Sequence, residues 1–198
     1  MEYPFLAMMS RMKYIERWAL MKNAAAENIC EHSLEVSMIA HMLVMISNKR
    51  LGNQYSADRA AVLAMYHDAT EIITGDMPTP IKYYNEEIKL AFKEIEEKAA
   101  SKLVGMLPED FQEDYKQIFF PSEEEKYLWK LVKAADRLSA LVKCIEEEKS
   151  GNTEFLQAKK SIEQSLRQSE LPEVQIFFDE FLPSFYKTLD ELSEPTQF

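Results

Sequence analysis

The sequence contains few residues that interrupt helices. Only four of its 198 residues are glycine, and it lacks the alternating runs of β-branched and aromatic residues that would define a sheet. Hydrophobic residues make up 46% of the chain and charged residues 29%, which is the balance of a folded globular protein rather than a disordered one. The composition therefore predicts an all-α fold, and the length suits one domain spanning residues 1–198.

Basic residues are also scarce, with 23 Lys and Arg against 34 Asp and Glu and a net charge of −11. A protein that binds nucleic acid nonspecifically needs a basic surface to displace counterions from phosphates. The charge therefore predicts no nucleic-acid partner. Any nucleotide that is bound should be small, and a few placed cations or a metal should hold it. The acidity also has a plainer interpretation, because it keeps a protein soluble.

Two cysteines, Cys30 and Cys144, are too few for a disulfide framework, and we expect both to be free, buried thiols. Residues 1–4 lack the basic and then apolar layout of a signal peptide. The most apolar stretch, residues 38–46, contains His41 and is too short to cross a bilayer. These features predict a cytoplasmic protein without a membrane partner.

Hydrophobic periodicity and Pro, Gly or Asn punctuation divide the chain into helices without a domain linker. Ser56 is a predicted N-cap, Ser122 opens a capping box, and Gly151 is placed to end a helix. Two prolines and a glycine should keep residues 74–80 out of a helix. The predicted helices span residues 5–18, 28–48, 57–67, 81–107, 122–149, 153–168 and 172–192.

The three histidines divide into two groups by helical position. His32 is in line with Val36 and Ile39 on the predicted helix 28–48, so it should point into the core. His41 lies nine residues further along, and at about 100° per residue it faces the opposite side. We expect His41 to be a packed core histidine or part of a dimer face.

The third histidine, His67, precedes Asp68 directly, and Glu71 follows one turn later. Residues three and four apart lie on the same helix face, so this turn collects one imidazole and two carboxylates. On the predicted helix 122–149, Asp136 falls on the inward face beside Ser139. A lone carboxylate there would cost several kcal/mol unless it is paired or binds a metal.

The imidazoles of His32 and His67 and the carboxylates of Asp68 and Asp136 form a mixed nitrogen and oxygen set. Such a set suits a divalent transition metal that keeps open coordination positions for water and substrate. The spacing alone leaves a second interpretation open. A His-Asp pair is common in proteins, and Asp136 could instead pair with Arg137, Arg17 or Lys133.

The order His…His-Asp…Asp over successive helices resembles the HD superfamily of metal-dependent phosphohydrolases. Longer strings are similar to the bacterial HD-domain 5′-deoxynucleotidases over essentially the whole chain. This resemblance implies an all-α HD-domain bundle that removes the 5′-phosphate from deoxyribonucleoside monophosphates. The strings are ERWALM (16–21), ENICEHSL (27–34), AMYHDATE (64–71), TGDMPTP (74–80), KAAD (133–136) and GNTEF (151–155).

The resemblance also implies roles for individual residues. Arg17 would grip the 5′-phosphate, and the Trp18 indole would crowd the C2′ edge of the sugar so that a ribose hydroxyl does not fit. Glu71 would assist proton transfer, with Asp68 also at the catalytic centre. One divalent ion per chain, Co²⁺ or Mn²⁺, and a homodimer are further expectations. The implied metal ligands are His32, His67, Asp68 and Asp136, and the implied substrate contacts are Arg17, Trp18, His32, Asp68, Asp76, Met77, Pro78, Thr79 and Asp136.

Some features depart from the family pattern, and rival functions stay open. Lys22 stands where relatives often carry Arg, and Ala25-Ala26 replaces more polar residues. One rival is another HD enzyme that acts on a nucleoside triphosphate, a cyclic nucleotide or guanosine tetraphosphate. A second rival is a regulatory protein that only binds metal or nucleotide. Glu71 favours an enzyme, because a binding site needs no spare carboxylate one turn from its ligands.

Overall fold

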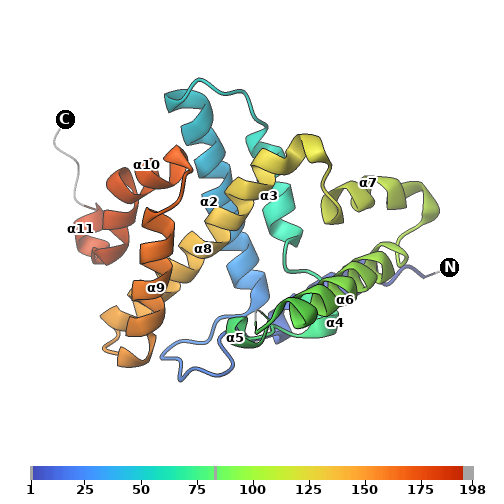
Figure 1. The fold of residues 1–198 in the computed structure, drawn as a ribbon, viewed down its shortest axis with the longest axis horizontal. Helices are drawn as coiled ribbons and strands as arrows, with labels where there is room; N and C mark the ends of the chain where they lie inside the picture. The colour runs from blue at the N-terminus through green and yellow to red at the C-terminus, as the bar shows by residue number, and fades with distance from the viewer. Residues whose placement is uncertain (1, 83, 194–198) are drawn as a thin grey trace.

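Three helices form the centre of the fold in the computed structural model, which describes residues 2–82 and 84–193. Helix α2 (Ile29–Arg50) packs against α3 (Ala57–Tyr66) and α8 (Lys126–Lys149). In Figure 1, α9, α10 and α11 lie on one side of this centre, while α6 and α7 lie on the other. The described residues contain helices and no strand, which confirms the predicted all-α class.

Helix α2 begins where the sequence predicts, because Asn28 caps it. The Asn28 side chain accepts hydrogen bonds from the backbone N–H groups of Cys30 and Glu31, and the Glu31 side chain completes a capping box. In the described part of the chain, α2 is the one helix long and apolar enough to cross a membrane by length and composition. However, 56% of its apolar window is buried inside the protein, so α2 is a core helix of the bundle.

The other predicted central helices are also confirmed. Ser56 caps α3 by accepting from the backbone N–H of Arg59, and Ser122 forms a capping box with Glu125. A 3-10 turn, η2 (Glu123–Glu125), leads into α8, and Gly151 follows this helix with a φ of 79°. Because α2, α3 and α8 pack against one another, the first turn of α2, the C-terminus of α3 and the middle of α8 lie close together.

The predicted first helix, residues 5–18, is present as far as Tyr14 and is wrong for its last four residues. Helix α1 (Phe5–Met9) and the 3-10 helix η1 (Ser10–Tyr14) end four residues before Trp18. The chain then extends and pairs with the segment before α2: the Arg17 N–H donates to the Glu27 carbonyl at 2.9 Å, and the Ile29 N–H donates to the Ile15 carbonyl at 3.0 Å. This long-range pairing overrides the local helical pattern and places Arg17 and Trp18 on a loop.

The predicted helix 81–107 is also wrong, because it is two helices. Helix α5 (Thr79–Lys82) is followed by α6 (Glu86–Val104), which Asn85 caps by accepting from the Ile88 N–H. Helix α4 (Glu71–Thr74) ends at Gly75, and the predicted irregular segment 74–80 is shortened because Thr79 and Pro80 open α5. Helix α7 (Glu109–Phe119), which follows Pro108, was not predicted.

The C-terminal region is more broken than the pattern predicts. The predicted helix 153–168 is present as η3 (Thr153–Phe155) and α9 (Leu156–Arg167). The predicted helix 172–192 is instead α10 (Pro172–Glu180), η4 (Leu182–Tyr186) and α11 (Leu189–Ser193). Pro183 has no N–H to continue an α-helix and explains the interruption.

The two cysteines are free, as expected, but only one is buried. Burial raises the pKa of the Cys144 thiol to about 11, so this thiol stays protonated and unreactive. The expectation of a buried thiol is wrong for Cys30, which lies on the exposed side of the first turn of α2.

Candidate active site

The four predicted metal ligands converge at one point from three central helices. His32 comes from the first turn of α2, His67 and Asp68 from the end of α3, and Asp136 from the middle of α8. The His32 Nε2 atom lies 3.1 Å from Asp136 Oδ1 and 3.5 Å from Asp68 Oδ2. The His67 Nε2 atom lies 3.2 Å from Asp68 Oδ2 and 3.9 Å from Asp136 Oδ1. Two donors about 2 Å from a common ion would be separated by roughly 3 Å, so these distances suit a shared ion.

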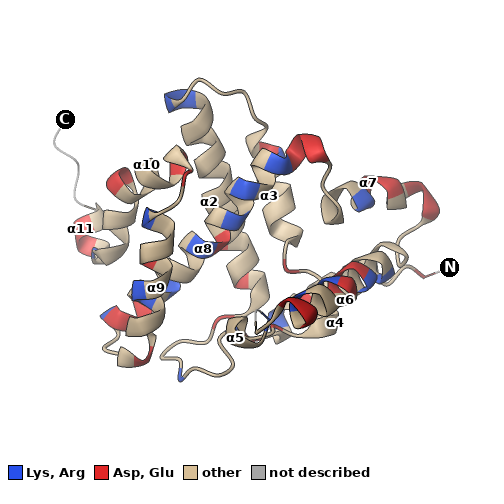
Figure 2. Ribbon diagram, in the orientation of Figure 1, with Lys and Arg blue, Asp and Glu red and all other residues tan. Residues whose placement is uncertain are grey.

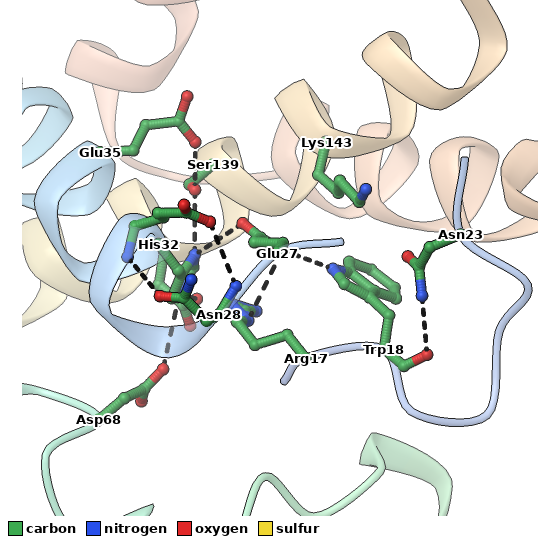
Figure 3. Close-up of polar contacts among 12 residues, drawn as sticks. Arg17, Trp18, Asn23, Glu27, Asn28, His32, Glu35, Asp68, Ser139 and Lys143 are labelled. Atoms are coloured by element: carbon green, nitrogen blue, oxygen red, sulfur yellow. Dashed lines mark hydrogen bonds and ion pairs between the residues drawn. The ribbon is translucent and has the colours of Figure 1, made fainter. Parts of the chain in front are cut away.

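Hydrogen bonds aim the Nε2 atoms of both imidazoles into this cluster. His67 Nδ1 lies 2.7 Å from the Ala64 carbonyl, which can only accept, so Nδ1 carries a proton and Nε2 is the nitrogen that would bind a metal after losing its own proton. His32 Nδ1 lies 3.1 Å from Ser139 Oγ, and Ser139 donates its own proton to Glu35 at 2.5 Å. Figure 3 shows His32 between Ser139 on one side and Asp68 on the other. Such outer hydrogen bonds typically fix the orientation of metal-binding histidines.

The charges of the cluster favour a cation. Burial lowers the pKa of His67, but the negative charges of Asp68 and Asp136 outweigh burial and raise it well above its usual value. Burial raises the pKa of Asp136, but its hydrogen bond with His32 and its ion pairs with His32 and His67 hold it well below the usual range. A field that holds a proton on a buried imidazole would equally hold a metal ion.

The donor set fits a divalent metal. Donor atoms of His32, His67 and Asp68 all lie within 4.8 Å of one another, and Asp136 Oδ1 faces both imidazoles. His67 Nε2 is buried and, although Asp68 Oδ2 lies 3.2 Å away, it makes no hydrogen bond of good geometry in the described residues. A donor left unsatisfied in a buried place needs a ligand to compensate for its lost water. Among the described residues Asp136 forms ion pairs with the two histidines and none with Arg137, Arg17 or Lys133, although the Arg17 charge does act on it electrostatically.

Glu71 occupies a separate position beside the cluster. Helix α3 ends at Tyr66, and a turn brings Glu71 to the start of α4, where its N–H donates to the Asp68 carbonyl at 3.0 Å. The side chain is buried, and its Oε2 atom has no hydrogen-bond partner in the described residues. Burial, and then repulsion from Asp68 and Asp76, raises the pKa of Glu71 to about 9. Glu71 is therefore a protonated carboxyl near neutral pH.

Arg17 lies next to the metal ligands with donors to spare. Burial lowers the pKa of Arg17, but the nearby carboxylates outweigh burial and the net effect is a raised pKa, so Arg17 stays charged. These carboxylates belong to Glu27, Asp68, Asp136 and Asp76. The Nε atom of Arg17 lies 3.9 Å from Glu27, while its buried Nη1 has no hydrogen-bond partner within the described part of the chain. A buried guanidinium with a free N–H is well suited to an anion.

Trp18 is held in an unusual conformation beside Arg17. Its φ of 59° makes it the one non-glycine residue with a positive φ among the described residues. The indole Nε1 donates to Glu27 at 2.9 Å, and the ring meets Phe155 edge to face at 5.2 Å between centroids. Figure 3 shows Glu27 between Trp18 and His32. A bulky residue at positive φ is strained, and such strain commonly marks a functional position.

The loop after α4 contributes one clear contact to this site. The backbone N–H of Trp18 faces Asp76, and together with the Arg17 charge it opposes the rise in the Asp76 pKa that burial and Asp68 cause. Met77 and Pro78 are partly buried beside this loop, whereas Thr79 is exposed at the start of α5.

Two residues join the site without having been predicted. Glu27 receives the Trp18 indole and lies 3.6 Å from His32 Nδ1, and Ser139 orients the same imidazole. The inward helical position of Ser139 was visible in the sequence, but nothing local identifies Glu27. His41 lies outside this site; its side chain is 44% exposed and 3.9 Å from Asp58, so a packed core histidine is the wrong alternative.

Comparisons with known proteins agree with this geometry. The family described as 5′-deoxynucleotidase YfbR-like matches residues 4–185. A 5′-deoxynucleotidase of Vibrio vulnificus (strain YJ016) is 47% identical over 192 residues, which are 97% of this chain and 99% of that protein. A 5′-deoxynucleotidase of Yersinia pestis (strain Pestoides F) is 48% identical over 192 residues, which are 96% of each chain.

Solved structures share the fold at lower identity. An HD-domain phosphohydrolase from Listeria innocua superposes with a TM-score of 0.79 at 23% identity, over 91% of this chain and 87% of that one. The cyanophage S-2L HD phosphohydrolase DatZ, bound to dA and one catalytic Zn²⁺ ion, has a TM-score of 0.62 at 22% identity, over 92% and 96% of the two chains. This chain therefore has the HD-domain fold and belongs to the YfbR-like 5′-deoxynucleotidase family.

Proposed function

We propose that this chain hydrolyses deoxyribonucleoside 5′-monophosphates to deoxyribonucleosides and phosphate. The convergence of His32, His67, Asp68 and Asp136 supports this function most directly, since their donor atoms lie 3.1 to 3.9 Å apart across the cluster. These four residues would hold one divalent ion. When bound, the ion supplies Lewis acidity that makes water nucleophilic near neutral pH.

Unsatisfied polar atoms support the placement of substrate beside this cluster. Six buried side-chain atoms have no hydrogen-bond partner in the described residues, and three of them belong to Arg17, His67 and Glu71. Arg17 binds the 5′-phosphate and neutralises the charge that builds up on its oxygens during transfer. Its buried Nη1 then gains the partner that it lacks.

Glu71 moves the proton in the reaction. In the metal-free chain its pKa is raised to about 9, so its carboxyl is suited to hold a proton and to donate it to the departing 5′-oxygen of the nucleoside. Asp68 lies next to Glu71 at the catalytic centre, but its role there is to bind the metal ion, so Glu71 and not Asp68 is the proton donor. A regulatory protein would have no use for such a carboxyl.

Trp18 and the loop that contains Asp76 bind the sugar. The indole packs against the C2′ edge and leaves no room for a ribose hydroxyl, while Asp76 reaches the sugar from beside the Trp18 N–H. Met77, Pro78 and Thr79 complete this wall of the site. A mixed nitrogen and oxygen ligand set accepts several first-row metals, and we propose Co²⁺ or Mn²⁺ as the ion that supports activity.

A phosphate-release panel tests the proposed function. The purified protein, stripped of metal and then supplied with Co²⁺, Mn²⁺ or Zn²⁺, is incubated with each deoxyribonucleoside and ribonucleoside 5′-monophosphate. Nucleoside triphosphates, cyclic nucleotides and guanosine tetraphosphate are included as rival substrates. We expect metal-dependent phosphate release from deoxynucleotides. Release from a rival class alone would assign a different HD reaction, and no release at all would favour a binding protein.

We also propose that two copies associate through α2, in the cytoplasm. Three exposed apolar residues, Leu34, Met38 and Met42, follow one another at four-residue spacing on this helix. Figure 2 shows that the middle of α2 carries no charged residue, in contrast to α6 and α7. An uncharged apolar row suits self-association of a chain with a net charge of −11, because it brings no like charges together. Light scattering of Met38→Lys against the natural chain tests this face.

A further inference from the structure

A polar row runs along α8 from the metal cluster to a distant loop. Asp136, Ser139, Lys143 and Glu147 are spaced by three, four and four residues, so they lie on one face of the helix. Asp136 contacts both histidines of the cluster, and Ser139 orients His32. The last two are buried charges, 5% and 1% exposed, and no step of the proposed reaction uses them.

Lys143 and Glu147 form an ion pair with each other, and both also form hydrogen bonds with the backbone of the loop 19–26. The Glu147 carboxylate accepts from the N–H of Ala24 at 2.8 Å and of Ala25 at 3.3 Å, and Lys143 donates to the Ala25 carbonyl at 2.5 Å. Asn152 adds two bonds, one to Glu147 at 2.6 Å and one to the Lys22 carbonyl at 2.8 Å.

These bonds hold the segment that follows Trp18. Residues 19–26 are mainly exposed and have no helix or strand of their own. At one end of the segment is Trp18 with its φ of 59°, and at the other is Glu27, which accepts from the indole. Phe155, which packs on the indole, follows Asn152 by three residues. A strained residue next to an exposed loop keeps its conformation only if its surroundings hold it.

We propose that the Lys143–Glu147 pair, together with Asn152, positions Trp18 and thereby sets the discrimination between deoxyribose and ribose. This inference rests on the proposed function, in which Trp18 contacts the sugar. The three residues do not touch substrate, so they are positioning residues rather than catalytic ones. Their effect reaches the sugar through the backbone of residues 22–25 and the indole.

A purely structural ion pair would be arranged differently. Such a pair could satisfy its spare donors and acceptors within its own helix or with solvent. Here, apart from Asn152, the partners are backbone groups of Ala24 and Ala25, which lie 118 to 123 residues away in the sequence on the loop that follows Trp18. Burial raises the pKa of Glu147, but Lys143, the loop N–H of Ala24 and Asn152 lower it to about 2, so the carboxylate stays charged while it holds the loop.

The test removes the pair without leaving a buried charge alone. In the double variant Lys143→Met with Glu147→Leu, apolar side chains of similar volume replace both charges, which is often neutral for stability. The Trp129→Phe background leaves Trp18 as the single tryptophan of the two in the chain, so fluorescence reports on it alone. The readouts are kcat/KM for a deoxynucleotide and its ribonucleotide, acrylamide quenching of Trp18, metal affinity by calorimetry and the melting temperature.

Retained melting temperature and metal affinity are expected, together with stronger quenching of Trp18. The ratio of kcat/KM for deoxyribose over ribose should fall about 10-fold, a large part of the roughly 100-fold that rejection of one hydroxyl can supply. Glu148→Gln is the matched control, because Glu148 also lies on α8 and forms an ion pair, with Lys159 of α9, but its side chain makes no hydrogen bond to residues 19–26 in the described structure. This control should leave the ratio and the quenching unchanged.

An unchanged ratio and unchanged quenching in the double variant would overturn the proposal, and so would an equal loss of activity on both sugars. If the double variant does not fold, Asn152→Ala applies the same two readouts with the ion pair intact. If the natural chain releases no phosphate from any nucleotide, the proposed function fails. The quenching of Trp18 then still decides whether the pair holds the loop.

Discussion

Replacing Glu71 by Gln should change how the stability of the metal-free protein depends on pH. The pKa of Glu71 is raised from 4.5 to about 9, first by burial and then by repulsion from Asp68 and Asp76. Between these two values the unfolded chain releases the proton while the folded chain keeps it. Folding therefore loses free energy as the pH rises, and the loss is complete only above the folded pKa.

The size of this effect follows from the same two pKa values. Between pH 5 and pH 8, ionisation of residue 71 favours the unfolded chain by about 4 kcal/mol. Gln has no proton to release, so Glu71→Gln should escape this loss. Its free energy of unfolding should therefore gain about 4 kcal/mol relative to the natural chain over that range.

Urea unfolding in the presence of a chelator measures this difference at pH 5, 6, 7 and 8. Glu124→Gln, on the exposed surface, is the control that removes a carboxyl without removing a buried one. Parallel stability curves for the natural chain and Glu71→Gln would refute the reasoning. They would mean that Glu71 is ionised in the folded, metal-free protein and that burial does not prepare it as a proton donor.

Three further predictions concern the loaded enzyme. Asp68→Ala and His67→Ala should each abolish metal binding and turnover without unfolding the protein, and full activity of metal-replete Asp68→Ala would show that the metal assignment is wrong. Glu71→Gln should slow the chemical step by about 10²- to 10⁴-fold while metal content and substrate affinity are kept, and a parallel loss of metal would make Glu71 a ligand instead. Trp18→Ala should bring the kcat/KM ratio of deoxyribonucleotide to ribonucleotide close to one, whereas an equal loss on both substrates would make Trp18 a structural residue.

The positions of His32 and Asp136 among the proposed metal ligands could be predicted because both residues obey local rules. Asn28 is a recognisable cap, and the spacing from His32 to Val36 and Ile39 places the imidazole on the buried face. Asp136 lies on the inward side of an amphipathic helix whose capping box is visible in the sequence. Periodicity and caps therefore place these two side chains on buried faces, whereas the family resemblance was needed to assign them, with His67 and Asp68, to one site.

The proposed sugar-binding side of the site could not be predicted in the same way. The apolar pattern of residues 5–18 favours a helix through Trp18, but the chain leaves the helix to pair with residues 27–29. The contacts of Glu147 with Ala24 and Ala25 cross 123 and 122 residues, and no local spacing indicates them. A break such as the one at Asn85 was at least detectable, since Asn followed by two glutamates is a common helix start.

The residues proposed for metal binding and the residue proposed for sugar selection are therefore held by different parts of the structure. His32, His67 and Asp136 are fixed by helices of the core, so only changes that unfold the bundle should displace them. Trp18 is on an exposed loop whose conformation depends on a few hydrogen bonds to α8 and the turn after it. Local opening of such a loop costs less free energy than opening of the core. Substrate selectivity should therefore change through loop and anchor substitutions that leave the metal cluster and the chemical step intact.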